Sequence, residues 1–384
     1  MSRQLLTNAT VVLADEVRQK LAVLIEDGKI AALDPEGAGD ATVIDLKDHT
    51  LMPGMIDLHC DSLEKEVEPR PGVHFAFDFA CAQADKRNAS AGITTVFHAL
   101  SFANREFGVR NNETAAALGR AIHAWQAHAL IDNKFHARFE VTDVTAPPVL
   151  SGLMEAGAID MISFMDHSPG QGQFRDVESF RNYLANAYKA DDATLDVIVK
   201  QKAEAAKGAV ERMQQLAKLA HANGVAIASH DDDSATKVEL VRDLGATVSE
   251  FPINLETAQA ARSHGIATLF GAPNILRGKS QSGNMRALDA VLAGVADCLC
   301  GDYSPASLLP ATFKLPEVAD ISLAHAVLLV TRNPARAAGL YDRGEIAVGK
   351  RADLVAVQRV GGLPHADQVW SRGKLVLGAS RVQH

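Results

Sequence analysis

The chain has 384 residues, 47% of them hydrophobic and 22% charged, which is long and apolar enough for one large folded domain and a smaller one. Its net charge of −9 at pH 7 argues against nucleic acid and membrane surfaces as partners, so an anionic substrate would need a local basic pocket. The four cysteines lack the CxxC spacing of zinc sites and lie in or beside apolar runs. We therefore expect buried thiols in a reducing compartment, the cytoplasm, at Cys60, Cys81, Cys298 and Cys300.

The first 50 residues contain short runs of strand-forming residues separated by turn signals such as Asp27-Gly28. The runs ATVVLA, KLAVLIEDG, KIAALD and TVIDLKDH predict a small antiparallel sheet. This alternation differs from the continuous apolar core of a signal peptide, and no window is apolar enough to predict a membrane span. Residues 345–384 repeat the pattern with three more strand candidates. We predict one small β-sandwich domain assembled from both termini, residues 1–52 and 345–384.

Between these ends, residues 53–344 alternate eight apolar strand candidates with helical stretches, the pattern of a (β/α)8 barrel. The strand candidates are MIDLH, ITTVFHA, HARFEVT, DMISFMD, VAIASH, TVSEF, ATLFGA and DCLCGD. Helical spacing of apolar residues predicts helices in NETAAALGRAIHAWQAHALID and ATLDVIVKQKAEAAKGAVERMQQLAKLAHANG. Residues 168–208 are longer than a typical crossover, and we hypothesise that they form a lid. The predicted fold class is α/β, a TIM-like barrel with a small β-domain.

The first barrel strand, in LMPGMIDLHCD, breaks off at a histidine and a carboxylate two residues apart. If strand geometry holds through both, His59 and Asp61 point to one face and form a two-residue metal clamp. One His-x-Asp alone is more often a surface pair, but several later strand candidates also end in His, Glu or Asp. Because the carboxyl ends of barrel strands lie on one rim, we expect a metal centre there. Its candidate ligands are His59, Asp61, Glu140, His167, His230, Glu250 and Asp302.

Mixed nitrogen and oxygen ligands suit a divalent metal, and this many can hold one or two ions; zinc is the first choice, with manganese or iron as alternatives. Two positions stay open, because Glu250 also fits an outward hydrogen-bond partner and Asp166 competes with His167 for the inward direction. Buried charges at a barrel mouth need a cation to pair them. On that ground the firmest ligands are His59, His230 and Asp302.

Two loops on the same rim carry cationic and small polar residues. The first follows strand one and contains Lys65 and Arg70; the second, GAPNILRGKSQSGN, follows strand seven. Cations, hydroxyls and exposed backbone N–H groups are the parts that hold phosphate oxygens, whereas glycine and serine alone would indicate only a flexible loop. We predict phosphate binding by Lys65, Arg70, Asn274, Arg277, Lys279, Ser280 and Ser282.

Several of these motifs resemble those of a known family. DLH-x-D after a Pro-Gly, together with GEIAVGKRADLV at 344–355, is similar to the amidohydrolase superfamily, a metal-bearing barrel with a small β-domain at its ends. Within it, the segments MDHSPGQGQF, IASHDD, GAPNILRGKSQSGN and GDYSPASLL, spread over most of the chain, resemble the PhnM family of phosphonate metabolism. The chain differs from the superfamily in having His-x-Asp for His-x-His, and Glu250 for a strand-six histidine.

This resemblance implies hydrolysis of alpha-D-ribose 1-methylphosphonate 5-triphosphate to the 5-phosphate and pyrophosphate, in the carbon–phosphorus lyase pathway. Our hypothesis is that a metal-activated water attacks the phosphorus nearest the ribose and that Asp302 takes its proton. Attack elsewhere would release a single phosphate. The alternatives are cleavage of a C–N bond by a cyclic amidase or deaminase, and a non-catalytic scaffold. The expected partner is a small phosphorylated molecule, and a homodimer is left open.

Overall fold

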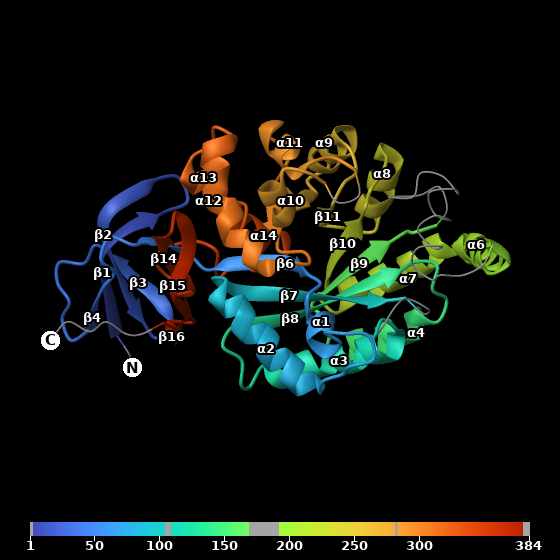
Figure 1. Cartoon of the computed structure of the whole chain (residues 1–384), viewed down its shortest axis with the longest axis horizontal. Helices are drawn as coiled ribbons and strands as arrows, with labels where there is room; N and C mark the ends of the chain where they lie inside the picture. The colour runs from blue at the N-terminus through green and yellow to red at the C-terminus, as the bar shows by residue number, and fades with distance from the viewer. Residues whose placement is uncertain (1–2, 104–108, 169–191, 281–282, 379–384) are drawn as a thin grey trace.

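The computed structural model describes residues 3–103, 109–168, 192–280 and 283–378 of the chain. Two sheets organise these residues. A parallel sheet with flanking helices fills most of the molecule, and a mixed sheet built from both ends of the chain lies to one side of it (Figure 1). Among the described residues, no helix combines the length and apolar character needed to cross a bilayer.

The parallel sheet is a nearly closed barrel, so the predicted fold class is confirmed. Its eight strands neighbour one another in chain order, and β13 returns beside β6, where Cys60 and Asp302 form a parallel bridge. Each predicted strand candidate contributes one strand. The bounds are β6 Met55–Cys60, β7 Ile93–Phe102, β8 Asp132–Glu140, β9 Met161–Met165, β10 Ala226–His230, β11 Val248–Glu250, β12 Ala267–Gly271 and β13 Cys298–Cys300.

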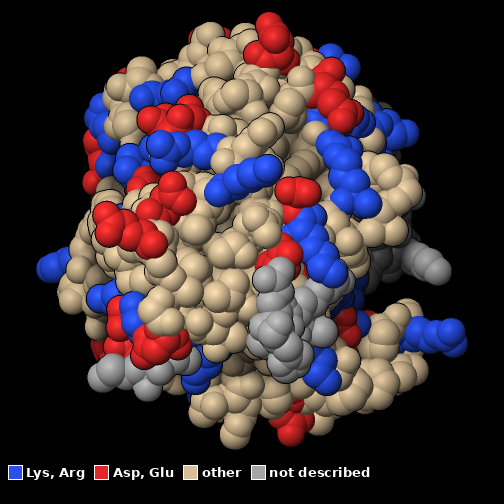
Figure 2. All heavy atoms as spheres, turned by 90° about the vertical axis from the view of Figure 1, so that its left-hand side faces the viewer, with Lys and Arg blue, Asp and Glu red and all other residues tan. Residues whose placement is uncertain are grey.

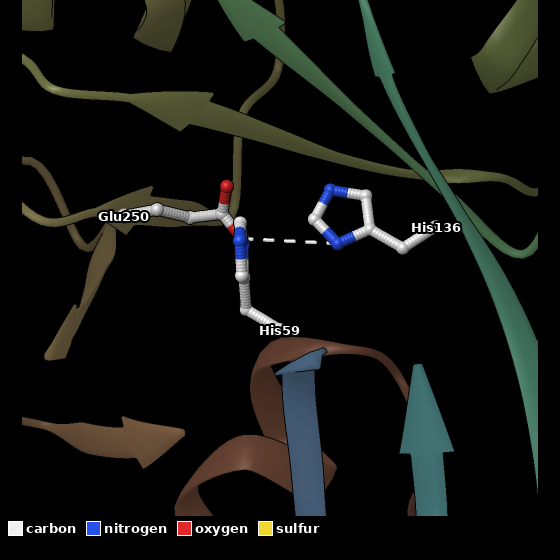
Figure 3. A group of neighbouring side chains, drawn as sticks. All are labelled: His59, His136 and Glu250. Atoms are coloured by element: carbon white, nitrogen blue, oxygen red, sulfur yellow. Dashed lines mark hydrogen bonds and ion pairs between the residues drawn. The ribbon is translucent and has the colours of Figure 1, made fainter. Parts of the chain in front are cut away.

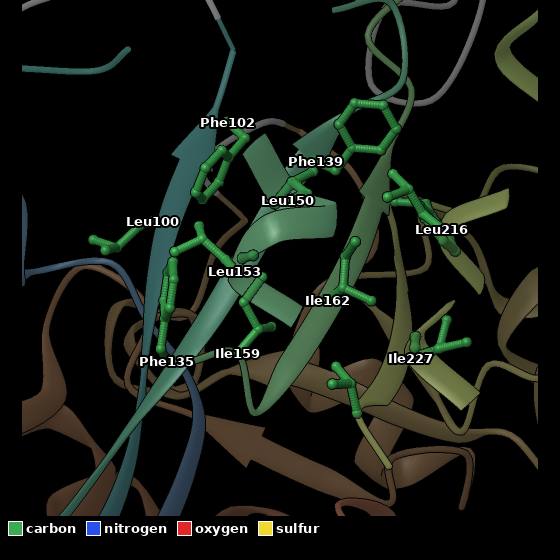
Figure 4. Packing of buried hydrophobic residues seen from close by; sticks show 14 of the residues in the cluster. Leu100, Phe102, Phe135, Phe139, Leu150, Leu153, Ile159, Ile162, Leu216 and Ile227 are labelled. Atoms are coloured by element: carbon green, nitrogen blue, oxygen red, sulfur yellow. The ribbon is translucent and has the colours of Figure 1, made fainter. Parts of the chain in front are cut away.

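Helices cover the outside of the barrel strands. Phe135 and Phe139 of β8 belong to a buried cluster that also contains Leu150 and Leu153 of α4, and Figure 4 shows this packing. Since these strands are buried on both faces, they read as apolar runs in the sequence. The helices are α1 Leu63–Val67, α2 Phe77–Ser90, α3 Asn112–Trp125, α4 Ala146–Glu155, α6 Asp192–Ala206, α7 Ala209–Ala222, α8 Ala235–Asp243, α9 Leu255–Ser263, α10 Ala272–Arg277, α11 Ala287–Leu292, α12 Leu308–Val318, α13 Leu323–Leu328 and α14 Arg332–Ala337, with a 3-10 turn η1 at Pro305–Ser307.

The long helix expected from ATLDVIVK to AHANG is two helices, α6 and α7. Gly208 separates them with a φ of 102°, a left-handed conformation that only glycine adopts at little cost. The other expected helix begins where the sequence suggested, because the side chain of Asn111 accepts a hydrogen bond from the backbone N–H of Thr114. Most of the hypothesised lid, residues 169–191, lies outside the described residues.

The terminal sheet joins the two ends of the chain through β5, which pairs with β1 on one side and with β14 on the other. It is mixed and not purely antiparallel as expected, because β1 runs parallel to β4 and β5. Acidic and basic side chains are interspersed over this end of the molecule (Figure 2). The predicted domain boundaries after residues 52 and 344 stay predictions. The strands are β1 Arg3–Val12, β2 Val17–Glu26, β3 Lys29–Leu33, β4 Thr42–Asp45, β5 Thr50–Pro53, β14 Leu354–Val360, β15 Leu363–Ser371 and β16 Lys374–Leu377.

Candidate metal centre at the mouth of the barrel

Polar side chains gather at the carboxyl ends of the barrel strands, where barrel enzymes place their chemistry. His59 is the next-to-last residue of β6, His230 ends β10 and Glu250 ends β11, and all three are buried. Three residues just after strands adopt left-handed backbone conformations, with φ of 51° at Asp231, 53° at Phe251 and 53° at Asp302. Such strained positions in non-glycine residues concentrate at functional sites.

His59 and Glu250 form the centre of the site. The Nδ1 atom of His59 lies 2.9 Å from Oε1 of Glu250, and His136 of β8 faces the pair (Figure 3). One ligand atom from each of the three residues lies within 4.8 Å of the others, which is close enough for one metal ion. Glu250 therefore points inward, which decides its orientation between the two alternatives that the sequence left open.

His136 was not predicted from the sequence, and its role differs from that of its two neighbours. Its Nδ1 lies 3.1 Å from the carbonyl oxygen of Leu58, and its Nε2 lies 2.8 Å from Oγ of Ser163. Both ring nitrogens thus have protein partners already. We infer that His136 supports the site by fixing the adjacent strands, while His59 and Glu250 are better suited to hold a cation.

A second group lies beside the first. The guanidinium of Arg138, also on β8, donates from Nη2 to Nε2 of His230 at 2.9 Å, and its Nη1 lies 3.8 Å from Oδ2 of Asp61. Arg110 approaches the same Asp61 oxygen to 3.7 Å. The sequence prediction missed Arg138, whose signal was its place two residues before Glu140 on an alternating strand.

Glu140 and His167 are paired with each other. The Nδ1 atom of His167 lies 2.8 Å from Oε2 of Glu140, and its Nε2 lies 3.9 Å from Oδ2 of Asp231. Burial would lower the pKa of His167, but the charges of Glu140 and Asp231 raise it to about 9. Asp166, the competitor for the inward position, instead lies 4.0 Å from Lys237 of α8.

Asp302 is attached to the first strand through the backbone. Its N–H donates to the carbonyl of His59 at 2.9 Å, and its own carbonyl accepts from the N–H of Asp61 at 3.1 Å. Burial and the charge of Asp61 raise the pKa of Asp302 to about 7. A carboxylate with a pKa near neutrality is well suited to exchange a proton during catalysis.

Asp57 lies behind these residues and was also missed. One of its oxygens, Oδ1, accepts hydrogen bonds from the N–H of His59 at 3.1 Å and from that of Gly301 at 3.0 Å. Burial raises the pKa of Asp57 to about 8. Asp57 therefore joins the ends of the first and last strands at the level of the site.

The residues present fit a divalent cation. Burial, reinforced by the charge of Arg138, lowers the pKa of His59 to about 3 and that of His230 well below its ordinary value, so both imidazoles are neutral at pH 7. A neutral imidazole offers the lone pair that a metal requires. Among the described residues, Oδ1 of Asp61 and Oε2 of Glu250 are buried acceptors without a hydrogen-bond partner.

The predicted phosphate-binding residues are partly brought together. Tyr303, directly after Asp302, accepts a hydrogen bond from Nη1 of Arg277 at 3.0 Å, and the ammonium of Lys65 lies 5.9 Å from its ring centroid. The remaining predicted residues are less closely joined. Asn274 uses Oδ1 to accept from the N–H of Ala287 at 3.1 Å, Arg70 and Lys279 are exposed, Ser280 is half-buried, and Ser282 lies outside the described residues.

Comparison with known proteins identifies relatives over most of the chain. The model of the Amidohydrolase family matches residues 50–376. The Alpha-D-ribose 1-methylphosphonate 5-triphosphate diphosphatase of Escherichia coli (strain K12) is 36% identical over 377 residues, covering 97% of this chain and 100% of the relative. A dihydroorotase of Mycobacterium tuberculosis is 27% identical over 395 residues, covering 88% of this chain and 85% of the relative.

Solved structures agree on the fold. N-isopropylammelide isopropylaminohydrolase from Burkholderia multivorans superposes with a TM-score of 0.67 and 17% identity over 100% of both chains. N-acetylglucosamine-6-phosphate deacetylase from Pasteurella multocida superposes with a TM-score of 0.66 and 14% identity, over 97% of this chain and 99% of that one. At these identities the likeness concerns the fold alone.

Proposed function

Because the chain belongs to the amidohydrolase family and has the barrel fold of its structural relatives, we propose that it is a metal-dependent triphosphate diphosphatase. The proposed substrate is alpha-D-ribose 1-methylphosphonate 5-triphosphate, and the products are the 5-phosphate and pyrophosphate. The proposed setting is phosphonate catabolism. The proposed compartment is the cytoplasm, because the four buried free cysteines suit a reducing environment.

The observation that carries this proposal is the 36% identity to a diphosphatase of that name over 97% of the chain. The cationic side chains at the mouth of the barrel also support the proposed diphosphatase function. Lys65 and Arg277 meet at Tyr303 beside Asp302, so cationic groups stand next to the residue proposed to handle the proton. A triphosphate needs such groups, because its phosphoryl oxygens carry the negative charge that must be neutralised during transfer.

In this proposal one or two divalent ions, zinc as the first choice, are held by His59, Asp61, His230, Glu250 and Asp302, with Glu140 and His167 as a neighbouring pair. Such ions lower the pKa of a bound water and neutralise phosphoryl charge.

Side chains of the protein bind the substrate and accept the proton. Lys65 and Arg277 bind the outer phosphate oxygens, and Tyr303 holds the Arg277 guanidinium in place by its hydrogen bond. Asp302 accepts the proton of the attacking water, because its backbone is hydrogen-bonded to that of His59 and Asp61 and its carboxylate therefore lies among the proposed metal ligands. The bond to the leaving pyrophosphate breaks as the water oxygen bonds to the phosphorus nearest the ribose.

The second candidate is hydrolysis of a C–N bond in a cyclic amide, which the 27% identity to dihydroorotases favours. The same barrel and metal ligands serve either reaction, so the fold does not choose between them. The choice rests on whether the substrate is a polyanion.

The test offers the metal-loaded protein the ribose methylphosphonate triphosphate and, separately, dihydroorotate, and follows the products by phosphorus NMR and by chromatography. We expect the 5-phosphate and pyrophosphate from the first and no reaction with the second. Release of single phosphate would place the attack at another phosphorus, and ring opening of dihydroorotate would refute the proposal in favour of C–N hydrolysis.

Asp302→Asn probes the proton step in the same assay. The variant keeps the shape and one ligand oxygen of Asp302 but loses its basic charge, so turnover should fall on the order of 10²- to 10⁴-fold while at least one metal is retained. Asp243→Asn, on the exposed surface of α8, is the matched control. Turnover within a few-fold of the parent at equal metal content would assign the proton to another group.

A further inference from the structure

Arg138 lies inside the mouth of the barrel and has no assigned role. It shares the inward face of β8 with His136 and Glu140, while Phe135 and Phe139 point outward into the helix layer. Its side chain is only 12% exposed, and its Nε atom is buried without a hydrogen-bond partner among the described residues. A permanent cation is thus held inside the site.

The surroundings of this guanidinium neutralise it only in part. Its hydrogen-bond acceptor is Nε2 of His230, and the Asp61 oxygen, at 3.8 Å, lies within ion-pair distance but beyond hydrogen-bond distance. That carboxylate is also approached by Arg110. A buried guanidinium that shares its counter-ion and leaves Nε without an acceptor is costly, so the position favours a further anion.

Metal binding by His230 would remove the hydrogen-bond acceptor of Arg138. An imidazole nitrogen has one lone pair, so Nε2 of His230 cannot accept from Arg138 and bind a cation at once. When His230 uses that nitrogen as a ligand, the guanidinium is released toward the mouth, and the nearest carboxylate, Asp61, is itself a proposed ligand. The released N–H groups are then free to donate to an anion from solution.

We propose that Arg138 is a catalytic residue that binds oxygens of the phosphoryl group undergoing attack, and that the site is therefore selective for phosphate-bearing substrates. This inference rests on the proposed diphosphatase function. The planar guanidinium fits two oxygens of one phosphoryl group, and its charge opposes the negative charge that develops there. Lys65 and Arg277, on the rim, serve the more distant phosphates.

The experiment compares the metal-loaded parent with Arg138→Gln, Arg138→Lys and the exposed surface control Arg242→Gln of α8. Three quantities are measured: metal content, the dissociation constant of inorganic phosphate by calorimetry, and kcat and KM for the triphosphate. Inorganic phosphate is the probe because it carries the recognised oxyanion without the ribose.

We expect Arg138→Gln to keep the parent's metal content, to bind phosphate at least tenfold more weakly and to lose kcat on the order of 10²-fold. Arg138→Lys should recover part of both losses, because it restores the charge and not the two-pronged geometry. Arg242→Gln should match the parent in all three quantities.

Unchanged phosphate binding in Arg138→Gln would overturn the inference, and so would a loss of turnover that follows a loss of metal. If Arg138→Gln fails to fold, Arg138→Lys decides, since parental phosphate affinity and kcat in that variant would contradict the two-pronged contact. A parent that releases no pyrophosphate yet loses phosphate affinity in Arg138→Gln would refute the diphosphatase function while upholding the anion-binding role.

Discussion

Replacing Asp132 with asparagine should destabilise the protein without touching its chemistry. Asp132 begins β8 and lies at the opposite end of that strand from Glu140. Its carboxylate pairs with Arg343 and with Arg351, whose Nη1 atom lies 3.2 Å away, and both arginines come from the C-terminal part of the chain. Thr95 of β7 accepts from the same two guanidinium groups, so the cluster ties the barrel to the terminal sheet.

The magnitude follows from the pKa of Asp132. Burial would raise this pKa, but Lys134 and the two arginines lower it from 3.8 to about 2. A difference of nearly two pKa units between the folded and unfolded states corresponds to about 2 kcal/mol of stability. Since the folded-state pKa is the lower one, this contribution is complete above about pH 4 and is lost as the pH falls toward about 2.

The assay is urea unfolding of the parent and of Asp132→Asn at pH 7, 5 and 3. The free energy of unfolding should differ by about 2 kcal/mol at pH 7 and by about half of that at pH 3. Asp243→Asn, whose 67%-exposed carboxylate pairs with Arg242, is the control and should change stability by less than about 1 kcal/mol. Equal stability of parent and Asp132→Asn at pH 7, or a difference independent of pH, would refute the reasoning.

Three further outcomes are expected at the mouth of the barrel. Gly301→Ala would place a Cβ 2.4 Å from Oδ2 of Asp57. It should lower the free energy of unfolding, measured by urea titration, by about 1–3 kcal/mol and remove most of the turnover. Gly152→Ala in α4 is the control and should not destabilise the protein, because its Cβ would meet nothing within 4 Å. Removal of divalent metal by a chelator should abolish turnover, and elemental analysis should show turnover returning in proportion to metal reloaded. Arg277→Ala should raise KM for the triphosphate with unchanged metal content, because its contact is with Tyr303 on the rim; parental kinetics or a loss of metal would contradict this role.

The barrel could be predicted because each of its strands carries a local signal. β7 is buried along its whole length, and several strands end in a polar residue that marks the mouth. The parallel pairing of β1 with β5 carried no such signal, since it depends on which distant strands meet and not on the residues within either one. The break at Gly208 was missed because one glycine is tolerated inside many helices, and the residue type alone does not say whether it adopts a φ of 102°.

From the sequence, the candidate site was predicted only for residues at or next to the ends of strands. His230 and Glu250 end their strands, His59 lies one residue from the end of β6, and all three were found. His136 and Arg138 lie further from the end of β8 and were missed. Their inward direction could have been read from the alternation with Phe135 and Phe139. The groups that they contact could not be predicted, because Leu58, Ser163 and His230 come from other strands.

The distribution of charge within the mouth bears directly on which bond is cleaved. The chain as a whole is acidic, with a net charge of −9, yet Lys65, Arg138 and Arg277 are placed on or inside the catalytic rim. A neutral cyclic amide would bring no charge to these cations, which would keep only carboxylates of the mouth such as Asp61 and Asp302 as counter-ions. A triphosphate brings several negative charges to the same place, so each cation gains a further counter-ion on binding. The same cations thus favour a substrate that is itself strongly anionic.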